Sequence, residues 1–114
     1  MLATIINALS TERFSLTVEK TTQIEIETLF NRNGIAHIKE YHLDKNNIPD
    51  FFIDGIAIEV KIKGNAKQIY RQCERYSKFK EVKIIILVTN RSMGFPKEIN
   101  GKPCYIINMG RAWL

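Results

Sequence analysis

The stretch that most constrains the fold of this chain is the segment 48–63, IPDFFIDGIAIEVKIK. It holds two short apolar runs separated by Asp54-Gly55, a pair that favours a two-residue hairpin turn. Pro49 favours an extended entry into the first run, because the residue before a proline is pushed out of the helical region. We therefore expect strands over 50–53 and 56–62, joined by a tight turn.

The second of these strands carries charges where a buried strand normally has none. Side chains alternate between the faces of a strand, so Ile58 and Val60 point one way, and Glu59 and Lys61 point the other. The apolar run 82–88, VKIIILV, is typical of a central strand covered on both faces, which makes the strand 56–62 an interior one as well. Buried Glu and Lys side chains require a partner or a metal ion.

The hairpin supplies a second carboxylate. With the turn at Asp54-Gly55, Asp50 can lie across from the region of Glu59 and Lys61. Two carboxylates on neighbouring strands form a hard, oxygen-rich site that suits Mg²⁺ or Mn²⁺. Such an ion lowers the pKa of a bound water and stabilises charge on a phosphodiester, and Lys61 can orient the water or offset that charge.

A helix is predicted between Thr17, a candidate N-cap, and Gly34, which follows the last turn. One stripe of this helix faces the core and becomes polar towards its N-terminal end. The stripe consists of Glu19, Gln23, Ile26 and Phe30. Glu25 lies off the stripe, so we expect Glu19 to face the sheet, with Glu25 as the second choice.

The remaining segments complete an α/β pattern. We expect a strand over 35–43, a turn at 44–47, a helix over 66–79, a loop over 89–103 and a last strand over 104–108. Residues 2–9 fit either a short helix or an edge strand, and Trp113 is expected to close the core. The order helix, three strands, helix, strand, with one strand appended, predicts a mixed central sheet flanked by helices.

The composition is that of a soluble globular protein. The 114 residues are 45% hydrophobic and 25% charged, which predicts one domain over residues 1–114. No apolar run approaches the length of a membrane span, so we expect a cytoplasmic location and no membrane partner. Cys73 and Cys104 lack metal-ligand spacing and are expected to be reduced core thiols, and His37 and His42 to be ordinary strand residues.

Positive charge is concentrated in one part of the chain. The formal net charge is +5 and the pI about 9.3. The segment 61–83 holds eight basic residues against two acidic ones. The basic residues are Lys61, Lys63, Lys67, Arg71, Arg75, Lys78, Lys80 and Lys83. A basic stripe of this kind attracts a polyanion through phosphate contacts. Charge alone leaves a merely solvated helix face as an equal alternative.

Pro49-Asp50, eight intervening residues and then Glu59-Val60-Lys61 resemble the signature of the PD-(D/E)xK nuclease superfamily. The likeness covers about residues 17–89 and is closest to the small VRR-NUC domains of phages and to archaeal Holliday junction resolvases. Two further matches are Glu19 and Gln23, similar to that group's Glu-x-x-x-Gln, and Gln68 after Lys61, similar to its Lys-x(6)-Gln.

The resemblance implies a restriction-endonuclease-like core and a metal-dependent endodeoxyribonuclease that recognises DNA structure, such as a branch or junction, rather than base sequence. Asp50 and Glu59 would bind Mg²⁺ or Mn²⁺, with the Val60 carbonyl and Glu19 as further ligands. Lys61 would position the nucleophile. Gln68 would support the site. The expected DNA contacts are Lys63, Lys67, Arg71, Arg75 and Gln72.

Junction-resolving relatives work as dimers, so the resemblance also implies a possible homodimer. Two other functions remain open at the level of sequence. One is a catalytically silent DNA-binding module that kept the fold, which intact Asp50, Glu59 and Lys61 argue against. The other is an RNA-directed nuclease, or a subunit of a larger complex.

Overall fold

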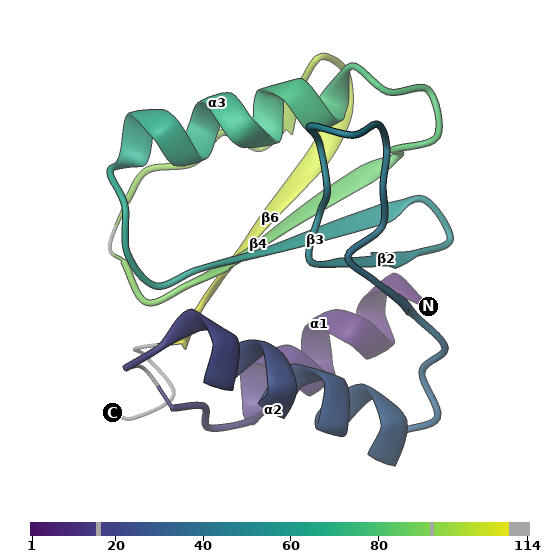
Figure 1. Cartoon of the computed structure of the whole chain (residues 1–114), viewed down its shortest axis with the longest axis vertical. Helices are drawn as coiled ribbons and strands as arrows, with labels where there is room; N and C mark the ends of the chain where they lie inside the picture. Colours follow the sequence, from purple (N-terminus) through teal and green to yellow (C-terminus); the bar gives the residue numbers. More distant parts are fainter. Residues whose placement is uncertain (16, 92, 110–114) are drawn as a thin grey trace.

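A central sheet with helices on both faces forms the architecture of the computed structural model, which describes residues 1–15, 17–91 and 93–109 (Figure 1). Helices α1 (Leu2–Thr11) and α2 (Glu19–Arg32) lie against one face, and α3 (Ala66–Ser77) lies against the other. Within the described ranges the protein is an α/β fold with a mixed, open six-stranded sheet flanked by three helices. The sequence predicted this class.

The strands run in the spatial order β1-β2-β3-β4-β6-β5. Their bounds are β1 (Ile38–Lys39), β2 (Phe51–Ile53), β3 (Ile56–Lys61), β4 (Ile84–Thr89), β5 (Glu98–Ile99) and β6 (Lys102–Asn108). Strands β1, β2 and β3 pair antiparallel, β3 and β6 both pair parallel with β4, and β5 pairs antiparallel with β6. Strand β4 is therefore central, and it is almost entirely buried, as its apolar run predicted.

The turn between β2 and β3 is the predicted Asp54-Gly55 pair. Both residues have positive φ, at 44° and 86°, which is the backbone conformation that a two-residue hairpin turn of this twist requires. The turn fixes the register so that Phe51 is opposite Ile58. Asp50, one residue before β2, is thereby brought level with Glu59, as the sequence predicted.

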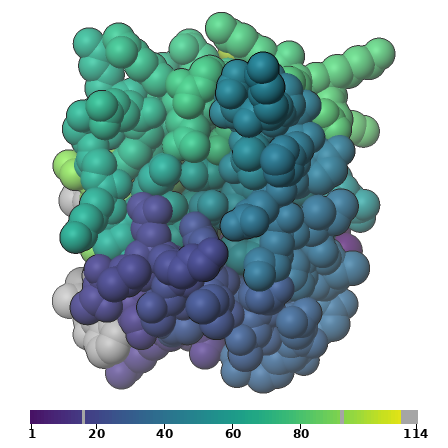
Figure 2. All heavy atoms as spheres, in the orientation of Figure 1, coloured from purple at the N-terminus to yellow at the C-terminus, as the bar shows by residue number. Residues whose placement is uncertain are grey.

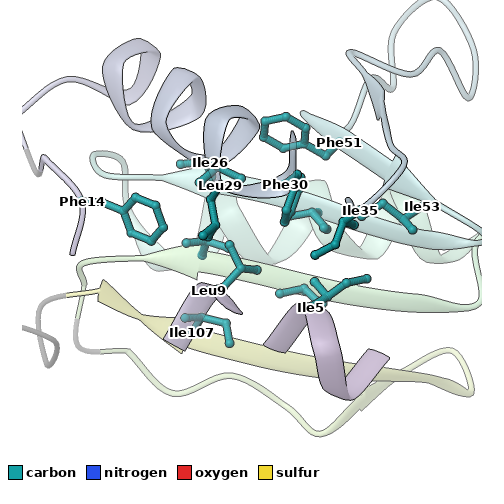
Figure 3. Packing of buried hydrophobic residues seen from close by; sticks show 14 of the residues in the cluster. Ile5, Leu9, Phe14, Ile26, Leu29, Phe30, Ile35, Phe51, Ile53 and Ile107 are labelled. Atoms are coloured by element: carbon teal, nitrogen blue, oxygen red, sulfur yellow. The ribbon is translucent and has the colours of Figure 1, made fainter. Parts of the chain in front are cut away.

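Two apolar clusters lie on the two faces of the sheet. On the face towards α1 and α2, Ile58 and Val60 of β3 are completely buried. They belong to a cluster with Ile5, Leu9, Ile26, Leu29 and Phe30 from the two helices (Figure 3). On the face towards α3, Cys73 and Cys104 are buried free thiols in a second cluster, as predicted.

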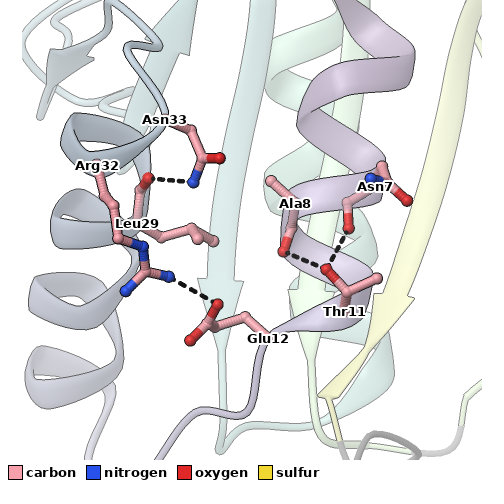
Figure 4. A network of polar contacts seen from close by, with 7 residues as sticks. All are labelled: Asn7, Ala8, Thr11, Glu12, Leu29, Arg32 and Asn33. Carbon is pink, nitrogen blue, oxygen red and sulfur yellow. Dashed lines mark hydrogen bonds and ion pairs between the residues drawn. The ribbon is translucent and has the colours of Figure 1, made fainter.

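Residues 2–11 form a helix, which settles the choice left open for the N-terminal segment. Side chains near the C-terminal ends of α1 and α2 are joined by an ion pair between Arg32 and Glu12 at 2.8 Å (Figure 4). The Asn33 amide donates to the Leu29 carbonyl at 2.8 Å, and the Thr11 hydroxyl donates within α1. Exposed ion pairs contribute at most about 1 kcal/mol, so apolar packing holds these helices in place.

The predicted strand over 35–43 is wrong for most of its length, because only Ile38–Lys39 pairs as a strand. Glu40 has a φ of +50°, which turns the chain out of the extended conformation. The two predicted strand histidines, His37 and His42, consequently lie outside strands. The His37 ring instead packs against the rings of Phe30 and Phe51.

The segment 89–103, predicted as a loop, contains β5 and the start of β6. Asn100 and Gly101 connect them with φ of 50° and 77°, so an Asn-Gly hairpin turn was present in the sequence and overlooked. Trp113, predicted to close the core, lies outside the described residues.

The C-terminal end of α2 agrees with the sequence prediction, and its N-terminal end does not. Gly34 follows the helix with a φ of +66°, as predicted for the residue after a helix. At the other end Val18, not Thr17, is the N-cap residue, and no side chain caps the helix there. No helix in the described part of the chain is long and apolar enough to cross a membrane.

Candidate active site

Asp50 lies at the entry to β2 and points at the neighbouring strand. Its Oδ2 accepts a hydrogen bond from the Val60 backbone N–H at 2.8 Å. Burial raises the pKa of Asp50 to about 6, although the Val60 N–H and the Lys61 ammonium act in the opposite direction. The Asp50 carboxylate is thus held by β3 itself, which is the strand that carries Glu59 and Lys61.

Glu59 is the most deeply buried acid of the site, with 3% of its surface exposed. Its Oε1 accepts a hydrogen bond from the Tyr76 hydroxyl at 2.8 Å, and its Oε2 lies 3.3 Å from the Lys61 Nζ. The pKa of Glu59 is raised to about 8, chiefly by burial and then by the Asp50 charge, while Lys61 and Tyr76 act in the opposite direction. Ionising both acids would therefore place two negative charges beside one lysine, which compensates them only partly.

Glu59 and Lys61 point to the α3 side of β3, whereas Ile58 and Val60 point to the α2 side. The predicted alternation is confirmed. Lys61 is the last residue of β3 and pairs in register with Thr89 of β4. Its side chain keeps 24% of its surface exposed, so the ammonium reaches both the buried carboxylate and the solvent.

Glu19 approaches from the first turn of α2. Its Oε1 accepts a hydrogen bond from the Ile62 backbone N–H at 3.0 Å, just past the end of β3. Its charge also contributes to the raised pKa of Asp50, and the Gln23 amide, four residues further along α2, lowers that pKa by hydrogen bonding. Glu25 instead accepts from the Ser15 backbone N–H at 3.1 Å, so Glu19 is the α2 acid that reaches β3.

Gln68 lies in the first turn of α3, where its side chain is exposed. Its backbone N–H donates to the Asn65 Oδ1 at 2.8 Å, which caps the helix. Within the described ranges the Gln68 side chain makes no hydrogen bond to the carboxylates. Of the residues expected at the site, the structure thus brings together Asp50, Glu59, Lys61 and Glu19.

Two residues further along α3, Gln72 one turn and Tyr76 two turns after Gln68, were not predicted to lie at the acid pair, although Gln72 was expected to contact DNA. The Gln72 Nε2 donates to the Tyr76 hydroxyl at 2.9 Å, and that hydroxyl donates to Glu59. Tyr76 is fully buried, and burial together with the Glu59 charge raises the pKa of its hydroxyl. The spacing of four residues, which places Gln72 and Tyr76 on one face of a helix, was the available signal.

The outer side of α3 carries a basic stripe formed by Lys67, Arg71, Arg75 and Lys78, all exposed. Their spacing of four, four and three residues keeps them on one side of the helix. Arg75 donates from Nε to the Asn47 Oδ1 at 3.2 Å. Lys63, also exposed, lies in the connection between β3 and α3 and extends the positive charge towards the site.

The donor chemistry of the site suits a hard divalent cation. In residues 1–15, 17–91 and 93–109, no cluster of three or more His, Cys, Asp or Glu side chains meets the geometry of a metal site. The two carboxylates of Asp50 and Glu59, however, each have a raised pKa, and the Asp50 charge is one cause of the raised pKa of Glu59. A cation bound by these carboxylate oxygens would offset that repulsion, and hard oxygen donors of this kind could hold Mg²⁺ or Mn²⁺.

Comparisons of the chain with protein-family models, curated proteins and solved structures give no match. The protein is an α/β fold with a buried pair of acids, a lysine beside them, and a basic helix on one side.

Proposed function

We propose that this protein is a metal-dependent endodeoxyribonuclease with a restriction-endonuclease-like core of the PD-(D/E)xK type. The observation that carries the proposal is the acid pair on β2 and β3. Asp50 bonds to the strand that carries Glu59, and Glu59 lies 3.3 Å from Lys61 in a buried site. A purely structural ion pair needs one carboxylate for one lysine. Here two buried carboxylates, Asp50 and Glu59, share the single ammonium of Lys61, which favours a site that also binds a cation.

Asp50, Glu59 and the carbonyl of Val60 would hold Mg²⁺ or Mn²⁺, and Glu19 would be the further acid that approaches from the first turn of α2. A bound ion of this kind supplies a water of lowered pKa and stabilises the charge of a phosphodiester group. Because Glu19 bonds to Ile62 through Oε1, its Oε2 remains the oxygen with which it would reach a ligand or a water.

Tyr76 and Lys61 act on different oxygens of Glu59. The Tyr76 hydroxyl holds Oε1 and so fixes the orientation of the carboxylate. Lys61 holds Oε2 through a flexible, partly exposed side chain, so its ammonium can exchange this contact for a phosphate oxygen or for the attacking water. In that position Lys61 would orient the nucleophile and offset the charge that develops on the phosphate.

The basic stripe of α3 would bind the DNA backbone. Lys67, Arg71 and Arg75 of this stripe and Lys63 before the helix are all exposed, and Gln68 is exposed in the first turn of the same helix. Phosphate contacts fix the position of a protein on DNA without reading the bases. The proposed enzyme therefore selects DNA by structure, such as a branch or junction, rather than by sequence.

The test is cleavage of supercoiled plasmid and of a four-way junction in the presence of Mg²⁺ or Mn²⁺. We expect Glu59→Gln and Lys61→Ala to lower the cleavage rate at least about 100-fold, the effect of removing one charge-stabilising group from an active site. The matched controls are Glu98→Gln and Lys97→Ala, which change an exposed acid and an exposed lysine of the β5 region. Chelation of the metal by EDTA should abolish cleavage.

The assignment is wrong if the wild-type protein is inert on every DNA substrate, or if Glu59→Gln and Lys61→Ala cut at the wild-type rate. Binding of DNA in EDTA without any cleavage in Mg²⁺ or Mn²⁺ would indicate a silent binding module instead. Single-stranded and hairpin RNA tested in parallel would show whether the substrate is RNA.

A further inference from the structure

A recess of about 300 Å³ opens between the start of α2 and the end of β3, and its apolar walls take no part in the chemistry described above. It is lined by Thr17, Val18 and Glu19 at the start of α2 and by Ile62 and Lys63 after the end of β3. The surface view shows the start of α2 lying against the segment that joins β3 to α3 (Figure 2). Glu19 belongs to both places, because it lines the recess and contributes to the raised pKa of Asp50.

Val18 is the residue of this recess that the fold does not explain. It occupies the N-cap position of α2 without making a capping hydrogen bond, where Ser, Thr, Asp or Asn would stabilise the helix. It is also 54% exposed, so it adds little to the core. An apolar side chain that does not cap the helix and is more than half exposed, at the wall of a recess, is available to a ligand.

The other residues that line the recess indicate the chemical class of the ligand. Ile62 is buried and supplies a second apolar surface, and Lys63 is exposed and supplies a cation. The Thr17 hydroxyl and the Glu19 carboxylate offer hydrogen-bonding oxygens. Apolar faces with a few polar groups at the edge are how enzymes hold an unstacked nucleobase, and the lysine complements the phosphate attached to it.

The size and place of the recess agree with a single base. Ligand pockets span about 300 to 1,000 Å³, and this one is at the lower end, which suits one ring system and not a longer ligand. A base inside a duplex is stacked and cannot enter a side recess, whereas an unpaired base at a branch or a frayed end can enter without a large unstacking cost.

We propose that the recess between Val18 and Ile62 is a nucleobase subsite, which takes one unpaired base next to the phosphodiester bond that is cut. The inference rests on the proposed nuclease function and gives that function its substrate preference: forked or branched DNA over fully paired DNA. Lys63 holds the phosphate of the inserted nucleotide, and the basic stripe of α3 holds the duplex arm.

The test uses forked DNA with 2-aminopurine at the unpaired position of the branch, and the full-length protein carrying Glu59→Gln so that binding is measured without cleavage. We expect the fluorescence to rise on binding, because the base leaves its stacked neighbours. Adding Val18→Ser should abolish the rise and weaken binding of the fork about 10-fold, equivalent to about 1.4 kcal/mol. Serine is a favoured N-cap residue, so this change does not threaten folding.

Ile38→Ser is the matched control, because Ile38 is 53% exposed, close to the 54% of Val18, and lies on the edge strand β1 away from the recess. It should leave the fluorescence rise and the affinity for the fork unchanged. Equal fork binding and equal fluorescence for Val18→Ser and Ile38→Ser would overturn the proposal, as would the absence of any fluorescence change with the parent protein.

The two proposals can fail separately. If the wild-type protein cuts DNA in Mg²⁺ and the fluorescence does not depend on Val18, the subsite is wrong and the nuclease function stands. If no DNA is cut but the Val18-dependent fluorescence rise is seen, the nuclease function is wrong and a site for an unpaired base remains.

Discussion

The two faces of β3 differ in what they contribute to the protein. On the face towards α1 and α2, Ile58 and Val60 are completely buried among apolar side chains. On the face towards α3, Glu59 is nearly as buried, but it meets a lysine and a tyrosine hydroxyl and carries a raised pKa. One strand thus combines a face that stabilises the fold with a face that lowers its stability whenever the acid is ionised.

The largest expected effect comes from the apolar face. Ile58→Ala should lower the free energy of unfolding by about 2–5 kcal/mol, because it leaves a cavity in a closely packed cluster. Urea denaturation measures the change. The control is Ile106→Ala on β6, where the side chain is 37% exposed and the loss should stay below about 1 kcal/mol. Equal losses at the two positions would contradict the contrast between a packed and an exposed isoleucine.

The polar face should make the metal-free protein less stable as the pH rises. Glu59 has a pKa raised to about 8 in the folded protein, so folding favours its protonated form. Its contribution to stability is complete below its unfolded pKa of about 4.3 and is lost as the pH rises through the folded value. Asp50, with a pKa raised to about 6, adds a fall between about pH 4 and pH 6.

The measurement is urea denaturation in EDTA at about pH 5 and about pH 8.5, where we expect a loss on the order of 2 kcal/mol. Glu59→Gln removes the titrating group, keeps a side chain of similar size, and should flatten most of this dependence. Two outcomes would contradict the raised pKa of Glu59. One is a wild-type protein that becomes more stable over the same pH interval, and the other is a Glu59→Gln variant whose free energy of unfolding changes with pH as much as that of the wild type.

The smallest effect concerns the hydroxyl that links the polar face to α3. Tyr76→Phe should lower the free energy of unfolding by about 1 kcal/mol at about pH 8.5, because ionised Glu59 loses a hydrogen-bond donor. The pKa of Glu59 should rise further, since the Tyr76 hydrogen bond lowers it in the intact protein. Cleavage should fall about 10-fold, the loss expected when the orientation of a metal ligand is no longer fixed.

For Tyr76→Phe, the pH at which stability is lost is read from denaturation curves, and the rate is read from plasmid cleavage. Tyr105→Phe, at a partly exposed position of β6, is the control and should change neither. A Tyr76→Phe protein with an unchanged pH dependence would show that the hydroxyl has no influence on the carboxylate.

The parts of the fold that depend on neighbouring residues were predictable from the sequence. The Asp54-Gly55 turn and the alternation of β3 are local patterns, and together they fixed the relation of Asp50 to Glu59. The helix spacing that separated Glu19 from Glu25 is equally local. The Asn100-Gly101 turn was just as visible, and its neglect explains why β5 was missed.

The parts that depend on distant contacts were not predictable. The predicted strand over 35–43 is shortened because Glu40 adopts a left-handed conformation. Glutamate is not a residue type that indicates this conformation in the sequence. The bond from Tyr76 to Glu59 joins residues 17 apart on a helix and a strand. The sequence marks Tyr76 as buried, but a buried hydroxyl takes its partner from whatever element packs against it.

The two acids that reach β3 from other elements differ in how far the chain must travel to bring them there. The bond from Asp50 to Val60 spans 10 residues of a hairpin, whereas the bond from Glu19 to Ile62 spans 43. Closing the longer loop costs about 1 kcal/mol more in chain entropy. The hairpin therefore contains its acid pair within one short segment of chain, and only Glu19 depends on the docking of the whole N-terminal layer.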